Sequence, residues 1–342
     1  MCRVRWWHAV VLLGWFPSAG ALETALAREL QASVVRVEAI DARGAVSSGS
    51  AVMIAADTYI TACHVVNGAE RIFLRHGIDS AVGHTARADT AEDLCILEAG
   101  AAFGTPAQIA VTLAPAVGDT VYAVGFEHGR GLTISSGRIY ALHDVRGGML
   151  IQTSAVFEGG ASGGGLFDDR GRLIGVLSFY GQAHGPYYFA LPVAWLDALP
   201  AAAPSLPAAA LWMRPIDEQP RFLQALTRTA EGDWDELARV ALHWTAEEPD
   251  RAAPWLALGA AYVKLDRAAQ ARAAYLRAMA LEPDRLDELR RLKALYEDAR
   301  NDQAAAETAL ALRWMEQARG QESLQAAIGP PAAEAACATG CR

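Results

Sequence analysis

The hydrophobic pattern of this chain changes its period once, at a proline-rich stretch, and no other feature constrains the fold as strongly. Before residue 199, short runs rich in Val, Ile, Thr and Tyr alternate with glycine-containing turns, which is typical of β-strands joined by hairpins. After residue 222, apolar residues return with the spacing of helices. The sequence therefore predicts a β-rich part followed by an all-α part.

Several runs in the first part have the character of strands. They are Ser33–Ile40, Gly49–Ile54, Tyr59–Val66, Thr120–Phe126, Leu132–Leu142, Leu150–Ala155 and Leu173–Phe179. Turn signals such as Asn67-Gly68 and Asp168-Asp169-Arg170-Gly171 separate them. Many short strands with hairpin turns favour a β-sandwich or barrels.

The stretch between the two parts, residues 199–220, contains five prolines and an Ala-rich filler. Proline fixes φ and has no N–H to donate, so it suits neither a central strand nor the interior of a helix. We therefore expect an extended, semi-rigid linker over these residues.

The second part repeats with a period of 34 residues. Pro249 and Pro283 are 34 residues apart, and Leu237, Ala271 and Ala305 keep the same interval. Between the prolines stand Trp255, Leu258, Gly259, Tyr262, Ala271, Tyr275 and Ala278, and this order is similar to the tetratricopeptide (TPR) repeat. We predict TPR repeats over residues 221–320, with small residues where paired helices approach and aromatic residues filling the space between them. An ordinary bundle of helical hairpins is the alternative.

Stacked repeats of this kind usually present a binding surface. We expect the concave face to hold a peptide, a partner protein or a second copy of this chain, which makes a homo-oligomer one possible state. Residues 321–342 follow the repeats, are rich in Ala, Gly and Pro, and predict a disordered tail.

The first 21 residues have the order of a secretory signal peptide. A basic opening with Arg3 and Arg5 precedes the eleven-residue apolar run Trp6–Phe16, and Ala19-Gly20-Ala21 follows. Eleven residues are too few to span a bilayer, which needs ~20. We expect cleavage after Ala21, no membrane span in the mature chain and an exported protein, periplasmic or secreted. A buried N-terminal helix or an uncleaved anchor is the alternative.

Composition excludes several classes of function. Apolar residues make up 52% of the chain and charged residues 20%, which supplies a packed core and excludes a largely disordered chain. The formal charge is −9, with no basic block beyond the first residues, so we expect no nucleic-acid partner. The motifs call for neither a metal nor a cofactor, and none is predicted.

Three segments of the β-rich part carry the residue types that acyl transfer needs. The first ends a strand at His64, and the second, Asp89–Leu97, places acids before an apolar strand. The third places Ser162 in a run of glycines. A serine hydroxyl needs an imidazole to take its proton, an acid to orient that imidazole and main-chain N–H groups at the oxyanion. Each segment alone is a weak signal, but the order His, Asp, Ser at strand-to-loop junctions makes the combination specific.

These segments resemble the trypsin-like serine peptidases, most closely the bacterial HtrA/Deg type. The matching motifs are Thr61-Ala62-Cys63-His64-Val65-Val66, residues 89–97, Ile151-Gln152-Thr153, Gly160-Ala161-Ser162-Gly163-Gly164 and Tyr188-Phe189-Ala190-Leu191-Pro192. The resemblance covers roughly residues 33–198. It implies a chymotrypsin-like double β-barrel over residues 22–198, with the site in the cleft between the barrels. The expected fold is therefore a β-barrel pair followed by an all-α TPR domain.

The resemblance also implies a role for individual residues. His64 would be the general base and acid, Asp93 would orient it, and Ser162 would attack the carbonyl carbon, while Asp89 is the local alternative to Asp93. The N–H groups of Gly160 and Ser162 would form the oxyanion hole. The substrate would be bound by Ser178, Phe179 and Tyr180, along an extended backbone, and by Val156 near the base of the specificity pocket. An apolar residue at 156 favours small or medium apolar side chains.

The sequence departs from the family's pattern around the serine. Ala161 stands where the family has Asn or Asp, and it cannot accept a new N-terminal ammonium, so activation by clipping is not expected. Gly159 and Gly165 stand where Pro is common, and extra glycine raises the entropy lost on ordering the loop. Whether the oxyanion loop is preformed is therefore left open. No PDZ module follows the β-rich part.

The cysteines allow more than one arrangement. Cys63 and Cys95 flank the base and the acid, and they form a disulfide, two buried thiols or, least favoured, part of a metal site. Cys337 and Cys341 are spaced for a small loop disulfide in the tail.

Taken together, the motifs predict an exported serine endopeptidase that cleaves extended polypeptide through an acyl-enzyme, with a TPR module that binds a protein or peptide partner. Two alternatives stand beside this prediction. One is a catalytically inactive, peptidase-like scaffold that acts through its repeats, and the other is an esterase for non-peptide substrates.

Overall fold

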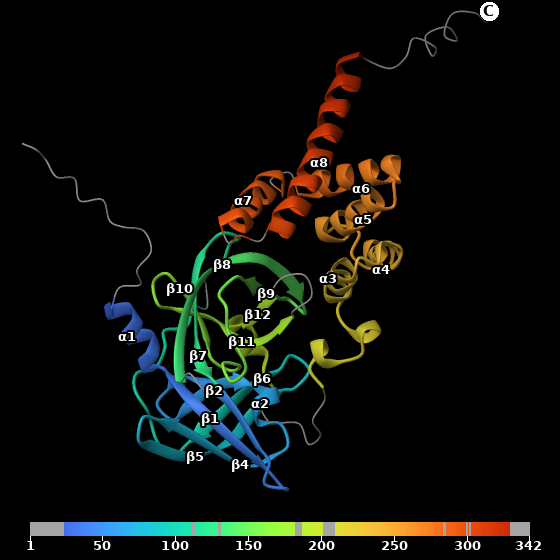
Figure 1. The fold of residues 1–342 in the computed structure, drawn as a ribbon. Coiled ribbons are helices and arrows are strands. Elements are labelled where there is room, and N and C mark those ends of the chain that lie inside the picture. The colour runs from blue at the N-terminus through green and yellow to red at the C-terminus, as the bar shows by residue number, and fades with distance from the viewer. Residues whose placement is uncertain are drawn as a thin grey trace, which may run out of the picture.

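The computed structural model describes residues 24–110, 114–128, 131–181, 187–200, 209–282, 285–298, 300 and 302–328. The predicted signal peptide and the Cys337 and Cys341 pair lie outside these residues. Two closed β-barrels are followed by a helical region, which lies against the second barrel (Figure 1).

The first barrel is built from strands between residues 34 and 99. Its strands are β1 (Val34–Asp41), β2 (Val46–Ala55), β3 (Thr58–Ala62), β4 (Ala69–His76), β5 (Asp79–Asp89) and β6 (Leu94–Ala99), and they close in the order β1-β2-β3-β6-β5-β4. Every neighbouring pair is antiparallel. Inward-pointing residues of alternate positions, such as Val35, Val37 and Leu97, form its core. Helix α1 (Thr24–Ala32) precedes β1, and the single helical turn α2 (Cys63–Val66) follows β3.

The second barrel has the same number of strands and is also antiparallel throughout. Its strands are β7 (Thr120–Glu127), β8 (Gly131–Val145), β9 (Gly148–Thr153), β10 (Gly165–Asp168), β11 (Leu173–Gly181) and β12 (Tyr187–Pro192), in the order β10-β11-β12-β9-β8-β7. The two six-stranded barrels confirm the predicted double β-barrel.

One predicted strand ends earlier than its sequence suggests. The apolar run 59–66 is strand only to Ala62, and Cys63 begins α2. The N–H of Cys63 donates to the main-chain oxygen of Asp93 at 2.8 Å. This hydrogen bond to the acid segment begins at the residue where the chain leaves the sheet. This turn gives His64 a position at the rim of the barrel rather than within a strand.

The helical region, residues 221–328, consists of successive helices. They are α3 (Arg221–Glu231), α4 (Trp234–Glu247), α5 (Ala252–Lys264), α6 (Ala268–Leu281), α7 (Arg285–Asp298) and α8 (Asp302–Ile328). Gly259 allows α5 and α6 to approach closely, since a Cβ there would lie 2.8 Å from the ring of the buried Tyr275. Helix α8 continues to Ile328, so residues 321–328, predicted as part of a disordered tail, are helical. None of the helices in the described part of the chain is both long and apolar enough to cross a membrane.

The described part of the proline-rich stretch differs from the extended linker that the sequence predicts. After η1 (Val193–Ala198), residues 209–220 contain two short 3-10 turns, η2 (Leu211–Met213) and η3 (Ile216–Glu218). The side chain of Trp212 is buried. An aromatic residue of this size loses contact with water by packing on the barrel, and this packing bends the segment back onto the protein.

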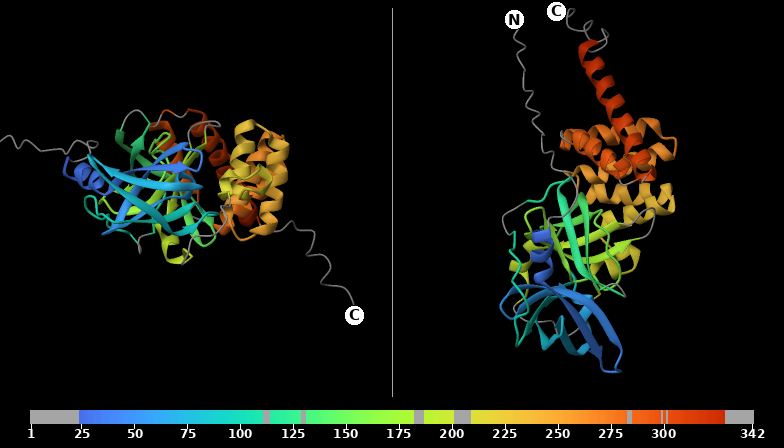
Figure 2. Two further views of the ribbon diagram at one scale, coloured as in Figure 1. Left: turned by 90° about the horizontal axis from the view of Figure 1, so that it is seen from below. Right: turned by 60° about the vertical axis from the view of Figure 1, so that its left-hand side comes forward.

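The helical region docks on the second barrel through aromatic and charged contacts. The ring of His143 on β8 stacks on Phe222 of α3 with centroids 4.2 Å apart, and an ion pair joins Arg251 to Asp144. Figure 2 shows the helices placed at the end of the second barrel, away from the first.

Candidate active site

The predicted base and acid lie in contact at the rim of the first barrel. His64 is carried by α2, and Asp93 immediately precedes β6. The Nδ1 atom of His64 lies 2.7 Å from Oδ2 of Asp93, and the main-chain N–H of His64 donates to Oδ1 at 2.7 Å. Asp93 is 1% exposed, whereas the imidazole keeps 28% of its surface exposed. Because an ionised carboxylate only accepts hydrogen bonds, this contact places the ring proton on Nδ1 and leaves a lone pair on Nε2.

The backbone of Asp93 is in the left-handed region, with φ +60°. Aspartate is one of the few non-glycine residues that adopt this conformation, at a cost of roughly 1–3 kcal/mol. The conformation turns the main-chain oxygen of Asp93 toward Cys63 and its carboxylate toward His64, so one residue holds two consecutive residues of α2. The strain is thus located at the residue that orients the imidazole.

A disulfide between Cys63 and Cys95 fixes the same two segments covalently. Cys63 directly precedes His64, and Cys95 is the second residue after Asp93. The bond excludes the buried-thiol and metal-site interpretations of this pair.

Ser178 on β11 connects the acid to the predicted nucleophile. Its hydroxyl donates to Oδ2 of Asp93 at 2.6 Å, and its main-chain oxygen accepts the hydroxyl of Ser162 at 2.9 Å. Within the described residues, the structure gives the Ser162 hydroxyl no hydrogen bond to the His64 ring. His64, Asp93, Ser178 and Ser162 therefore form one cluster, in which the hydroxyl of Ser162 is turned toward Ser178.

The main-chain N–H groups of residues 160–164 differ in their hydrogen bonding. Gly160 has φ +97°, and the carbonyl of Gly159 accepts the N–H of His128 at 2.9 Å, which directs the N–H of Gly160 the opposite way. The N–H groups of Ala161, Gly163 and Gly164 donate to the oxygens of Glu158, Leu177 and Ala161. Among the residues that the structure describes, no acceptor bonds the N–H of Gly160 or of Ser162. These are the two groups that the resemblance assigned to the oxyanion hole.

A match to a known family covers most of the two barrels. Residues 49–176 match the model of the trypsin-like peptidase domain. They include strands β3–β10 with His64, Asp93 and Ser162, whereas β1, β12 and Ser178 lie outside the matched residues. This part of the chain is similar to a trypsin-like peptidase domain.

Solved structures with a similar chain were also found. The serine endoprotease from Yersinia pestis is 27% identical, with a TM-score of 0.46, over 51% of this chain and 63% of that one. The Rv3671c protease from M. tuberculosis, in its active form, is 24% identical with a TM-score of 0.48, over 54% of this chain and 88% of that one. An HtrA-type protease with a bound tripeptide is 24% identical with a TM-score of 0.46, over 51% of this chain and 60% of that one. The search of curated proteins found no match.

Ser50 supports the loop that carries Ser162, and sequence analysis missed it. Its hydroxyl donates to the main-chain oxygen of Gly160 at 2.9 Å and accepts the N–H of Phe126 at 2.8 Å. Its N–H donates to the oxygen of Ser162 at 2.8 Å, and Thr61 in turn donates to its oxygen at 2.6 Å. In the sequence, Ser50 ends the small polar run Ser47-Ser48-Gly49-Ser50, which carries no signal of a buried role.

Small residues allow this loop to pack against the barrels. A Cβ on Gly163 would lie 2.0 Å from the oxygen of Ser50, so glycine is required there. Ala161, which replaces the family's Asn or Asp, is fully buried against Gly125, where an added Cβ would lie 2.8 Å from its own. Ala161 therefore acts as a small packing residue in this domain.

The remaining candidate residues take different positions in the peptidase domain. Asp89 accepts the N–H groups of Ala91 and Glu92 at 3.0 and 3.1 Å, so it caps its own loop and leaves the imidazole to Asp93. Val156 is 47% exposed, so its side chain is open to solvent.

Residues 178–180 belong to β11, as expected, but they serve different contacts. Ser178 is buried against Asp93, and Phe179 stacks on Phe189 with ring centroids 4.6 Å apart. The backbone of Tyr180 pairs with Tyr188 of β12, while its side chain lies outside the described part of the structure.

Proposed function

We propose that this protein is an exported serine endopeptidase that cleaves extended polypeptide by way of an acyl-enzyme. The observation that carries the proposal is the hydrogen-bonded cluster of His64, Asp93, Ser178 and Ser162, beside two main-chain N–H groups without an acceptor among the described residues. The trypsin-like peptidase domain supports the same chemistry.

In the proposed mechanism, Ser162 rotates about its Cα–Cβ bond, away from the oxygen of Ser178 and toward Nε2 of His64. Nε2 takes the hydroxyl proton as Oγ bonds to the carbonyl carbon of the substrate. The imidazolium then gives that proton to the leaving amine, and the acyl-enzyme remains. A water molecule, deprotonated by the same nitrogen, releases the acid product and returns the proton to Ser162. Asp93 stays ionised and stabilises the imidazolium throughout.

The N–H groups of Gly160 and Ser162 would stabilise the negative oxygen that forms in each tetrahedral intermediate. Preorganised donors of this kind are worth about 10²–10³ in rate each. We further propose that the backbone of residues 178–180 pairs with the substrate and that Val156 contacts an apolar substrate side chain.

The export and partner proposals rest on separate observations. The disulfide between Cys63 and Cys95 favours an oxidising compartment, in keeping with the signal peptide that the sequence predicts. The helical hairpins of residues 221–328 support a TPR-like module that binds a protein or peptide.

Labelling of the purified protein by a fluorophosphonate tests the enzyme proposal. We expect stoichiometric labelling at Ser162 and digestion of casein, and we expect Ser162→Ala to lose both while keeping its thermal unfolding midpoint. Folded wild-type protein that is neither labelled nor able to digest casein, under reducing and non-reducing conditions, would contradict the proposal.

A second candidate is an inactive, peptidase-like scaffold that acts through its helical region. The direction of the Ser162 hydroxyl, toward Ser178 rather than the imidazole, favours this candidate. In proteins without bound substrate, however, the hydrogen bond between a nucleophile and its base is often long and tightens only when the substrate binds. A peptide aldehyde distinguishes the two, because an active site forms a hemiacetal with it and protects Ser162 from fluorophosphonate, whereas a scaffold shows no labelling to protect.

A further inference from the structure

The segment between the second barrel and the helical region touches two catalytic segments at once. We call residues 209–219 the strap. The N–H of Leu211 donates to the main-chain oxygen of Ala91 at 3.0 Å, two residues before Asp93. The ring of Trp212 stacks on Phe179, with centroids 4.7 Å apart and planes 15° apart, next to Ser178. Two consecutive residues of the strap therefore hold the acid loop and the strand that bears Ser178.

The acid loop and strand β11 are joined by one hydrogen bond of the site, between Ser178 and Asp93. Ser178 donates to Oδ2 of Asp93 at 2.6 Å, and the same oxygen contacts the imidazole. A shift of the acid loop relative to β11 would lengthen this bond or turn the carboxylate. Displacements of about 1 Å in catalytic geometry cost up to about 10²-fold in rate.

Phe179 lies in contact with two aromatic rings. Phe179 stacks on two rings, Phe189 of β12 at 4.6 Å and Trp212 of the strap at 4.7 Å. Trp212 is 9% exposed, and its indole N–H has no hydrogen-bond partner in the described structure. Leaving a buried N–H without a hydrogen bond costs free energy. The contacts of the Trp212 ring must offset that cost, so these contacts determine where the side chain lies.

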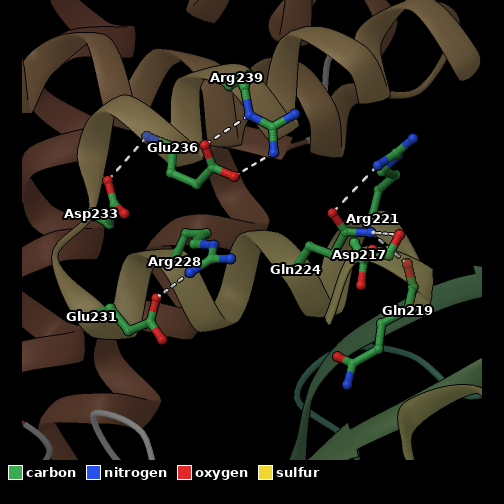
Figure 3. Close-up of polar contacts among 9 residues, drawn as sticks. All are labelled: Asp217, Gln219, Arg221, Gln224, Arg228, Glu231, Asp233, Glu236 and Arg239. Atoms are coloured by element: carbon green, nitrogen blue, oxygen red, sulfur yellow. Dashed lines mark hydrogen bonds and ion pairs between the residues drawn. The ribbon is translucent and has the colours of Figure 1, made fainter. Parts of the chain in front are cut away.

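The shape of the strap depends on the helical region. The side-chain amide of Gln219 donates to the main-chain oxygens of Trp212 and Arg214, at 3.1 and 2.8 Å. Gln224 of α3, which is 4% exposed, donates to the main-chain oxygens of Asp217 and Gln219, at 3.3 and 2.7 Å (Figure 3). The first helix after the barrels therefore fixes the strap in the form that reaches the acid loop.

We propose that Trp212 is a positioning residue of the peptidase site, contributed by a segment outside the double barrel. It acts through Phe179, together with the Leu211 amide, to hold Asp93 and Ser178 in register. This inference rests on the proposed serine endopeptidase function. It extends the catalytic unit of this chain to about residue 219, beyond the barrel that the resemblance defines.

Steady-state kinetics of the full chain, normalised to the fraction of Ser162 that a fluorophosphonate titrates, test the proposal. For Trp212→Ala we expect kcat per titrated site to fall about tenfold or more, with KM for a short chromogenic substrate within about twofold of wild type. Trp212→Phe keeps a ring on Phe179 and should recover most of the loss. A purely structural role would lower only the titrated fraction.

Two further variants keep the test sharp if Trp212→Ala folds poorly. Leu211→Pro removes the N–H that bonds Ala91 and suits the first position of a 3-10 turn, since Ala210 before it has φ −53° and ψ 148°. We expect it to lower kcat per titrated site as well. Trp244→Ala removes an equally large buried side chain, 7% exposed in α4, and should keep the wild-type kcat per titrated site.

The outcomes separate the two proposals. Wild-type protein that is not labelled overturns the proposed function and this inference together. Labelled wild type with Trp212→Ala and Leu211→Pro both within twofold of its kcat per titrated site overturns only the positioning role of the strap.

Discussion

Asp93 holds His64 at two points, with one carboxylate oxygen on the main-chain N–H and the other on the imidazole, each at 2.7 Å. The backbone and the ring of the histidine are therefore oriented by one buried side chain. This relationship leads directly to the first prediction, and the contacts around it lead to the others.

Asp93→Asn should lower kcat/KM by about 10⁴-fold, because an amide no longer requires the ring proton on Nδ1 and the tautomer with a free Nε2 is lost. Initial rates on a peptide substrate measure the effect. Asp89→Asn is the matched control, since it keeps an oxygen to cap its loop, and should stay within a few-fold of wild type. A larger loss in the Asp89 variant than in the Asp93 variant would reassign the acid.

Ser178→Ala should lower kcat/KM by about 10–100-fold. It removes the hydroxyl that donates to Asp93, and a hydrogen bond to a charged group is worth about 1.5–3 kcal/mol. The main-chain oxygen that accepts the Ser162 hydroxyl stays in place. Ser33→Ala removes another buried hydroxyl, which bonds Leu30, and its rate should remain that of wild type. Equal rates for both variants would show that the Ser178 hydroxyl does not support the acid.

Gly160→Ala should reduce the rate of fluorophosphonate labelling by about 10²–10³-fold, because the turn cannot keep its conformation. The residue has φ +97°, and a Cβ would lie 2.7 Å from the oxygen of Phe126. Gly159→Ala introduces the same methyl group where only the ring of His128 is near, at 3.2 Å, and should be far milder. Wild-type labelling by the Gly160 variant would exclude its N–H from the oxyanion hole.

Loss of the disulfide should lower the free energy of unfolding of the peptidase domain by about 3–4 kcal/mol, from the 32-residue separation of its cysteines. The double variant Cys63→Ser, Cys95→Ser tests this by denaturant unfolding. A reducing agent should lower the stability of the wild type to that of the double variant and leave the double variant unchanged. Labelling of Ser162 should also slow, because the disulfide flanks both the base and the acid.

Glu92 should make the stability of the protein depend on pH. Glu92 directly precedes Asp93 in the chain and is buried, and burial raises the pKa of its carboxyl. Arg146, whose Nε lies 3.0 Å from Oε1, lowers this pKa, and the negative charge of Asp89 raises it further. The Glu92 carboxyl therefore binds its proton more tightly in the folded state than in the unfolded state. Its contribution to the free energy of unfolding is full below the pKa of the unfolded state and is lost as pH rises through the raised pKa of the folded state.

The variant Glu92→Gln removes this titration. We expect the unfolding temperature of the wild type, measured relative to that of the variant, to fall as pH rises from about 4 to about 8. Glu70→Gln changes an exposed carboxyl and should follow the wild type at every pH. A constant difference between wild type and Glu92→Gln over this range would contradict the prediction.

The sequence determined the parts of this protein that local patterns encode. Alternating apolar runs and glycine turns specify strands, and the 34-residue spacing specifies paired helices, because both follow from which residues a short segment must bury. His64, Asp93 and Ser162 could be chosen because acyl transfer needs those residue types in motifs that resemble a known family.

Only the tertiary structure decided how distant segments contact one another. Three contacts illustrate this. The disulfide joins Cys63 to Cys95, 32 positions apart, and the stack joins Phe179 to Trp212, 33 positions apart. The hydrogen bond from Ser50 to Gly160 spans 110 positions. No local pattern encodes them, because each depends on how the barrels close and on where the strap turns back. Polar and aromatic side chains that read as turn or linker residues in the sequence become buried contacts only when the fold has brought their partners to them.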